Sequence, residues 1–256
     1  MFFSDIFVVG TTPSFFAFLF MGIIIGSIGV LFGGTMFLSL PLFQLLIPGV
    51  SSGSIIGNIK VGSFFRGIGS TLATWKIIHW KENFVLSLIL SLGAIFGVSV
   101  IAQIDQKWIF PMVCMAIILT ESAPFFTKFF ASQKTFFASV FLVGIYQGVL
   151  GAGISVFLLA LLRIKEPDET QITRLRIQAN YIEWFTTFVV VIASFFYNTL
   201  IFSVFLPWSM GSLLGGYLGS FLLHSFGKFS GKTQMYFLRF SFLVAIITSG
   251  ITFYSH

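Results

Sequence analysis

Glycine clusters interrupt two apolar segments of this sequence, Gly29-Val30-Leu31-Phe32-Gly33-Gly34 and Gly148-Val149-Leu150-Gly151-Ala152-Gly153, at places 119 residues apart. Glycine costs a helix roughly 1 kcal/mol relative to alanine. Backbone released from a helix inside a bilayer is tolerated only where it is buried in protein or lines a water-filled cavity. Interrupted apolar segments at corresponding places in two halves of a chain therefore indicate a transporter with its substrate site near the membrane midplane.

The composition is that of a membrane protein. Hydrophobic residues make up 57% of the 256 residues and charged residues 9%, and several apolar runs exceed the roughly 20 residues that cross a bilayer as a helix. We therefore expect an all-α polytopic membrane protein with a single transmembrane domain over residues 1–256. The net charge of +6 does not indicate nucleic acid, because most basic residues fall in short loops, where positive charge records membrane orientation.

No cofactor, metal or disulfide is expected. Cys114 is the single cysteine and lies in an apolar run, so it is interpreted as a small buried hydrophobe. The three histidines are not at the spacing of metal ligands.

Polar breaks divide the chain into ten apolar segments, and each half has the same order of a glycine-broken pair followed by three long segments. The internal repeats are therefore about 14–122 and 136–254. Glycines at four-residue spacing in the corresponding long segments, 93–97 and 211–219, predict close helix packing. We expect helices at about 14–31, 35–47, 52–75, 83–104, 108–122, 136–149, 153–163, 169–197, 200–224 and 233–254.

The basic residues decide between two topologies. If 14–47 and 136–163 each cross the membrane once, the lysines and arginines near the span ends divide four against five, with no bias. If each is a re-entrant hairpin, the division is eight against one, Lys107, as the positive-inside rule requires of a cytoplasmic face. The eight are Lys76, Lys81, Lys128, Lys134, Arg163, Lys165, Lys228 and Lys232.

The hairpin topology makes the two halves inverted repeats. Hairpin arms of about 12 to 17 residues reach past the midplane and return. Three full crossings follow each hairpin, so the second hairpin enters from the side opposite to the first, and both termini lie outside the cytoplasm. The two glycine tips are then expected to meet near the membrane centre, each with backbone N–H groups and a helix-end dipole.

A further stretch, Gly33-Gly34-Thr35-Met36-Phe37-Leu38-Ser39-Leu40-Pro41, on a chain of about 250 residues in two similar halves, resembles the sulfite exporter TauE/SafE family. The glycine-rich layout Gly211-Ser212-Leu213-Leu214-Gly215-Gly216-Tyr217-Leu218-Gly219 is also similar to that family. The resemblance covers nearly the whole chain. It implies a bacterial or archaeal inner-membrane transporter of sulfur-containing anions such as sulfite and sulfoacetate. Phe32 and Ala152 stand where a fuller glycine run would be expected in the family.

Lys60, Arg66 and Glu183 are the charged residues deep inside predicted spans. A charge at a helix centre costs roughly 2.5–3.5 kcal/mol on insertion scales, so it is usually retained for a pathway or a partner. Two interpretations stay open for the two cations. They bind an anionic substrate, with arginine able to contact two oxygens at once, or they pair with Glu183 or reach a water-filled vestibule.

The predicted substrate site combines the tip glycines with polar residues of the helix after each hairpin: Gly33, Gly34, Asn58, Lys60, Arg66, Gly151, Gly153, Gln178 and Asn180. Glu183 is predicted to couple transport to protons. Arg174 and Arg176 are predicted to lie near the cytoplasmic end, as vestibule or headgroup contacts. Four tryptophans, Trp75, Trp80, Trp108 and Trp208, are predicted at the membrane interfaces.

We expect a secondary transporter, an exporter by the resemblance, that moves small anions such as sulfite, a sulfonate or a carboxylate across the inner membrane by alternating access. The expected partners are this anion and the lipid bilayer, and no enzymatic activity is expected. A passive anion channel and a membrane-embedded enzyme are the alternatives. The substrate, the direction, the coupling ion and the oligomeric state stay open, with a homodimer among the alternatives.

Overall fold

The computed structural model describes residues 12–47, 50–78, 80–101, 104, 108–129, 133–165, 172–197, 200–226 and 231–254. Within these ranges the secondary structure consists of ten α-helices and one short 3₁₀ turn, without a strand, so the predicted all-α class is confirmed. The elements are α1 (Thr12–Phe32), α2 (Met36–Leu46), α3 (Ser52–Thr74), η2 (Trp75–Ile77), α4 (Trp80–Ile101), α5 (Ile109–Phe129), α6 (Gln133–Val149), α7 (Ile154–Lys165), α8 (Ile172–Phe196), α9 (Phe202–Phe226) and α10 (Gly231–Tyr254).

The helices match the ten predicted segments within about three residues at most ends. The main difference is α5, which continues to Phe129, beyond the predicted end at 122. The predicted boundary at 122 rests on a polar break, and Glu121 and Lys128 lie on either side of it. Both are good helix formers, so charge alone did not stop the helix.

Both glycine clusters break the helices as predicted. Between α1 and α2 the φ angles of Gly33 and Gly34 are +75° and +68°, and between α6 and α7 those of Gly151 and Gly153 are +68° and +74°. Only glycine adopts this left-handed region without steric cost, since a Cβ there approaches the following carbonyl oxygen. The four glycines therefore fix the two chain reversals.

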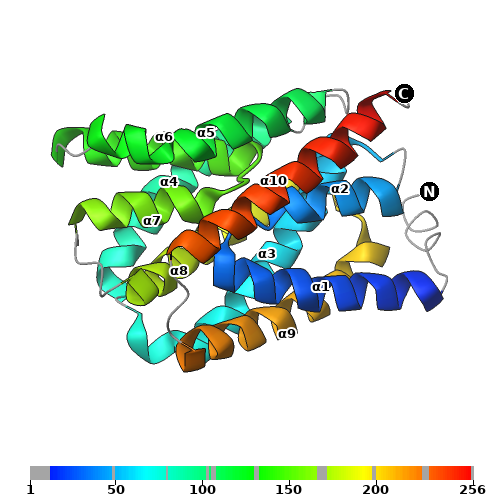
Figure 1. Ribbon diagram of the computed structural model, residues 1–256, viewed down its shortest axis with the longest axis horizontal. Coiled ribbons are helices and arrows are strands. Elements are labelled where there is room, and N and C mark those ends of the chain that lie inside the picture. The colour runs from blue at the N-terminus through cyan, green and yellow to red at the C-terminus, as the bar shows by residue number, and fades with distance from the viewer. Residues whose placement is uncertain are drawn as a thin grey trace.

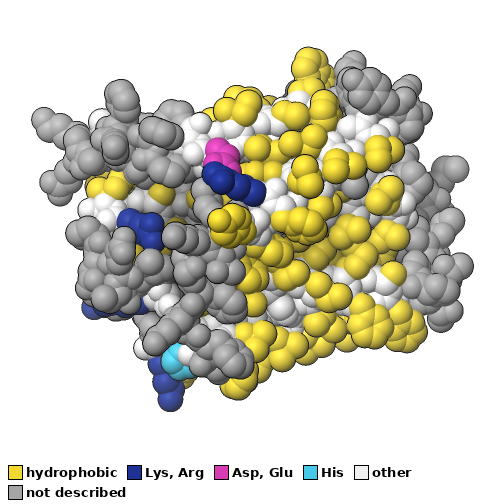
Figure 2. All heavy atoms as spheres, viewed as in Figure 1, with side chains coloured by type: hydrophobic (Ala, Val, Ile, Leu, Met, Phe, Trp, Pro, Cys, Tyr) yellow, Lys and Arg dark blue, Asp and Glu magenta, His cyan; other side chains and the backbone are white. Residues whose placement is uncertain are grey.

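The first arm of the first hairpin is longer than the 12 to 17 residues expected. α1 has 21 residues and α2 has 11, against 17 in α6 and 12 in α7. By length and composition, α1 is one of three helices in the described ranges that can cross a membrane, through Phe15–Phe32, together with Asn83–Ile101 in α4 and Thr173–Phe196 in α8. Hydrophobic side chains cover much of the described surface in Figure 2.

The helix contacts of the two halves correspond. α1 packs along α9, and α6 packs along α4; α3 also contacts α9, as α8 also contacts α4. α2 meets α10, α7 meets α5, and α3 and α8 contact each other. In Figure 1, α2 lies towards the end of the molecule where α1 begins and α10 ends, whereas α7 lies towards the opposite end.

The glycine stripes make the close helix packing that their spacing predicts. A Cβ added at Gly211, Gly215 or Gly219 of α9 would overlap carbonyl oxygens of α1, and one at Gly93 or Gly97 of α4 would overlap carbonyl oxygens of α6. Each α1–α9 or α4–α6 pair therefore brings two backbones into direct contact.

Trp208 was predicted at a membrane interface, but the structure places it in the core. Its side chain is 2% exposed, and its ring packs edge-on against Phe43 with centroids 4.9 Å apart and over Gly62, which leaves room for the indole. Trp208 lies inside α9 and directly follows Pro207, which is an internal residue of that helix. Trp75, Trp80 and Trp108 are exposed.

Candidate functional site

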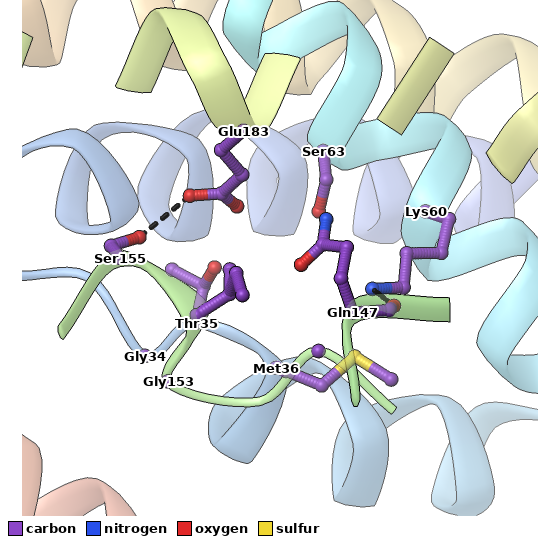
Figure 3. Close-up of a pocket in the computed structure, with 11 residues that line it drawn as sticks. Gly34, Thr35, Met36, Lys60, Ser63, Gln147, Gly153, Ser155 and Glu183 are labelled. Carbon is purple, nitrogen blue, oxygen red and sulfur yellow. Dashed lines mark hydrogen bonds between the residues drawn. The ribbon is translucent and has the colours of Figure 1, made fainter. Parts of the chain in front are cut away.

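The two hairpin tips line one small cavity (Figure 3). Its free volume is about 10 Å³, close to the minimum for one water molecule. The first tip contributes Gly34, Thr35 and Met36, and the second tip contributes Gly151, Gly153, Ile154 and Ser155. The flanking helices contribute Lys60, Ser63, Gln147 and Glu183.

Each tip presents the start of a helix to this cavity. α2 begins at Met36 and α7 at Ile154. No described residue accepts a hydrogen bond from the N–H groups of Gly34, Thr35, Ala152 or Gly153. Free N–H groups and the positive end of the helix dipole favour an anion at such a place. Gly33 lies between the tips, since a Cβ there would approach the Cβ of Ser155 to 3.2 Å.

Arg66 and Glu183 form a buried ion pair beside the cavity. Arg66 Nη2 lies 2.5 Å from Glu183 Oε1, and each residue is 7% exposed. Arg66 Nη1 donates to Thr35 Oγ1 at 2.6 Å, and Ser155 Oγ donates to Glu183 Oε2 at 2.6 Å. The pair therefore connects the first tip, α3, α8 and the second tip in one hydrogen-bonded chain. Of the two cations that could pair with Glu183, the structure selects Arg66.

Lys60, on α3, has its ammonium group at the C-terminal end of α6. Its Nζ donates to the backbone oxygen of Gln147 at 2.8 Å, within the last turn of that helix. A cation at a helix C-terminus satisfies a free carbonyl and opposes the negative end of the dipole. The ammonium also lies against Gly151, where a Cβ would collide with it.

Arg176 was predicted to be a vestibule or headgroup contact because of its distance from Pro167. The structure shows instead a buried residue, 5% exposed. Its guanidinium donates to Leu31 O and, at 3.1 Å, to Phe32 O, the last two carbonyls of α1. No sequence pattern indicated that the broken end of α1 lies against α8. Arg174 of the same helix is half-buried.

Lys60 and Arg176 therefore have the same role, because each caps a helix end in the other half of the chain. Lys60, on α3 of the first half, caps the broken end of α6 in the second half. Arg176, on α8 of the second half, caps the broken end of α1 in the first. Each half thus holds the hairpin of the other.

Five predicted site residues are not among those that line the cavity. Gly33 and Arg66 lie next to lining residues, Ser155 and Glu183 respectively, whereas Asn58, Gln178 and Asn180 have other places. Asn58 donates to Ser54 O at 2.8 Å and accepts from Ile201 N at 3.2 Å, so it joins α3 to the start of α9. Gln178 accepts a hydrogen bond from Asn83 Nδ2 and joins α8 to α4. Asn180 is half-buried, and its Nδ2 meets no acceptor among the described residues.

Six lining residues were not predicted: Thr35, Met36, Ser63, Gln147, Ile154 and Ser155. Four of them follow the glycine clusters directly, so extending each cluster by two residues finds them. Gln147 was also accessible to the same reasoning, because it immediately precedes Gly148 at the end of an apolar segment. Ser63 carries no signal beyond its place one turn after Lys60.

A family model described as sulfite exporter TauE/SafE matches residues 18–253. This chain belongs to the sulfite exporter TauE/SafE family. No curated protein and no solved structure gives a significant match. The predicted family is therefore confirmed, and the chain is a multi-pass membrane protein of a transporter family.

Proposed function

We propose that this protein is a secondary transporter that exports a small anion, sulfite or another sulfur-containing or organic anion, across the inner membrane by alternating access. The observation that carries the proposal is the cavity between the starts of α2 and α7, lined by Lys60. The family matched over residues 18–253 supports the class of cargo.

The anion is held by donors from both hairpins. Gly34, Thr35 and Gly153, whose N–H groups have no acceptor among the described residues, line the cavity at the starts of α2 and α7. Lys60 has three ammonium protons, of which one is used on Gln147 O, so its remaining donors are available to oxygen atoms of the anion. Gly33 and Gly151 allow the backbone to approach the substrate closely.

Binding and release require the tips to separate. A cavity of about 10 Å³ has room for about one water molecule, so it is too small for an anion with four or more heavy atoms. The structure therefore corresponds to a closed state of the cycle. The corresponding contacts of the two halves and the opposite placement of α2 and α7 (Figure 1) support inverted repeats, in which each hairpin opens the site to one side.

The Arg66–Glu183 pair couples the anion to a proton. An ionised Glu183 binds the guanidinium of Arg66 at 2.5 Å and so takes the place of the oxygens of an anion. A proton on Glu183 removes this charge and frees Arg66 for two oxygens of the substrate. The anion and the proton then move together.

Purified protein in liposomes, with a panel of labelled anions, tests the proposal. A carrier exchanges internal for external anion, so unlabelled sulfite inside the vesicles should accelerate uptake of labelled sulfite. With the membrane potential held at zero by potassium and valinomycin, a passive channel shows no such acceleration, and a membrane enzyme moves no label. Failure to move any anion of the panel, in protein that is folded and inserted, would overturn the proposal.

A further inference from the structure

Gln147 has an amide whose orientation the surrounding hydrogen bonds determine. The side chain is 1% exposed, and Nε2 donates to Thr187 Oγ1 at 3.1 Å. Thr187 Oγ1 in turn donates to Glu183 O at 2.7 Å. A hydroxyl has one proton, and here that proton is directed to a carbonyl. Thr187 Oγ1 can therefore only accept a hydrogen bond from Gln147. The amide nitrogen of Gln147 must then face Thr187, and Oε1 must point away from it.

The oxygen of this amide is an unused acceptor. Gln147 Oε1 is buried and has no hydrogen-bond donor among the described residues, although Gln147 lines the cavity. In Figure 3 the amide reaches towards Ser63, with its oxygen on the side where Glu183 and Ser155 lie. A buried acceptor without a donor is costly, so such a group indicates a ligand or a water that satisfies it.

The unused acceptor and a cation border the same small space. A Cβ added at Gly151 would lie 3.0 Å from Gln147 Oε1 and would collide with the ammonium of Lys60. The absence of a side chain at Gly151 therefore keeps a space that has a positive donor on one side and a neutral acceptor on the other. A site for an anion with acceptor atoms alone has no use for this oxygen, because it would face another lone pair.

We infer that Gln147 selects anions that carry their own hydrogen-bond donor, such as a hydroxyl, an amino group or an acid proton. The charged end of the substrate lies at Lys60 and the tip N–H groups, and its donor lies on Gln147 Oε1. This inference rests on the proposed function and narrows its substrate class. A site built around one hydrogen bond rejects the analogue that lacks the donor, since the protein group is then left unpaired.

The test compares anions that differ in the donor alone. Binding to the purified full chain is measured by calorimetry for 2-hydroxyethanesulfonate against ethanesulfonate, and for glycolate against acetate. We expect the hydroxylated member of at least one pair to bind about tenfold or more tightly. Gln147→Met keeps the length of the side chain and removes the acceptor, so it should abolish this preference by weakening the hydroxylated anion alone. Gln44→Met, the same change at a buried position of α2 that does not line the cavity, should keep it.

Each other outcome has a defined meaning. If the wild-type protein binds the hydroxylated and the unhydroxylated anion of a pair equally well, the inference is overturned, whereas the proposal of anion transport stands. A water molecule would then be the hydrogen-bond donor to Gln147 Oε1. The wild-type comparison suffices for this result even if Gln147→Met does not fold. Binding of sulfite without binding of any of the four probes also overturns the inference. If no anion binds, sulfite included, the proposed function itself has failed.

Discussion

Arg66 and Glu183, 117 positions apart in the sequence, form an ion pair of 2.5 Å that is buried between the two halves of the protein. Thr35 of the first hairpin tip binds the cation, and Ser155 of the second tip binds the carboxylate. Charges removed from water are stable only when paired and hydrogen-bonded. The pair therefore makes the closed arrangement of the tips dependent on both charges being present.

The first prediction concerns the stability of this pair. Arg66→Met leaves Glu183 buried without its cation and should lower the free energy of unfolding by about 3–5 kcal/mol. The double variant Arg66→Met/Glu183→Gln leaves no unpaired charge and should lose less than Arg66→Met alone. Denaturation in detergent of the two single variants and the double variant measures the difference. Additive losses would show that the two side chains do not depend on each other in the folded protein.

The second prediction concerns coupling. Glu183→Gln cannot change its charge when a proton arrives, but the amide oxygen can still accept from Arg66 and Ser155. We expect exchange of labelled anion between the two sides of a liposome to continue, while the dependence of net transport on a pH gradient disappears. Full pH-driven transport by this variant would mean that Glu183 carries no proton in the cycle.

The third prediction concerns the cap on α1. Arg176→Met removes the donors to Leu31 O and Phe32 O and leaves two buried carbonyls without their cation. The end of α1 should then open more often, and amide hydrogen exchange over residues 31–33 should accelerate about 5- to 150-fold, as expected for the loss of about 1–3 kcal/mol. Arg174→Met, two positions away on the same helix, is the control and should leave this exchange unchanged. Equal exchange in wild type and Arg176→Met would assign the guanidinium no part in holding the tip.

The sequence predicted the helices and the breaks well, because both depend on local composition. The positive φ angles of Gly33 and Gly151 follow from residue type, and the packing of Gly211 on α1 follows from spacing. The partners of the charged residues could not be read in this way. Which cation meets Glu183 depends on how α3 crosses α8, and the capping role of Arg176 depends on where the end of α1 lies in three dimensions.

The fourth prediction concerns topology. With eight basic residues on one side and Lys107 on the other, the positive-inside rule places both termini outside the cytoplasm. A reporter that is active only outside the cytoplasm should therefore be active when fused at either terminus and when inserted between Asp105 and Lys107. It should be inactive at Lys76. Activity at Lys76, or a cytoplasmic C-terminus, would contradict the inverted-repeat arrangement.

The central claim is that an anion binds between the two hairpin tips, and the affinity of Lys60→Met for sulfite tests it most directly. Lys60 is 4% exposed, lines the cavity and donates to the end of α6, so loss of its charge should weaken sulfite binding about tenfold or more, by the 1.5–3 kcal/mol of a hydrogen bond to a charged group. Lys76→Met removes an exposed lysine of η2 that does not line the cavity and should leave the affinity unchanged. Calorimetry on purified variants, with the melting temperature of each as the check of folding, gives the result. A folded Lys60→Met protein that binds sulfite as tightly as wild type would contradict the account.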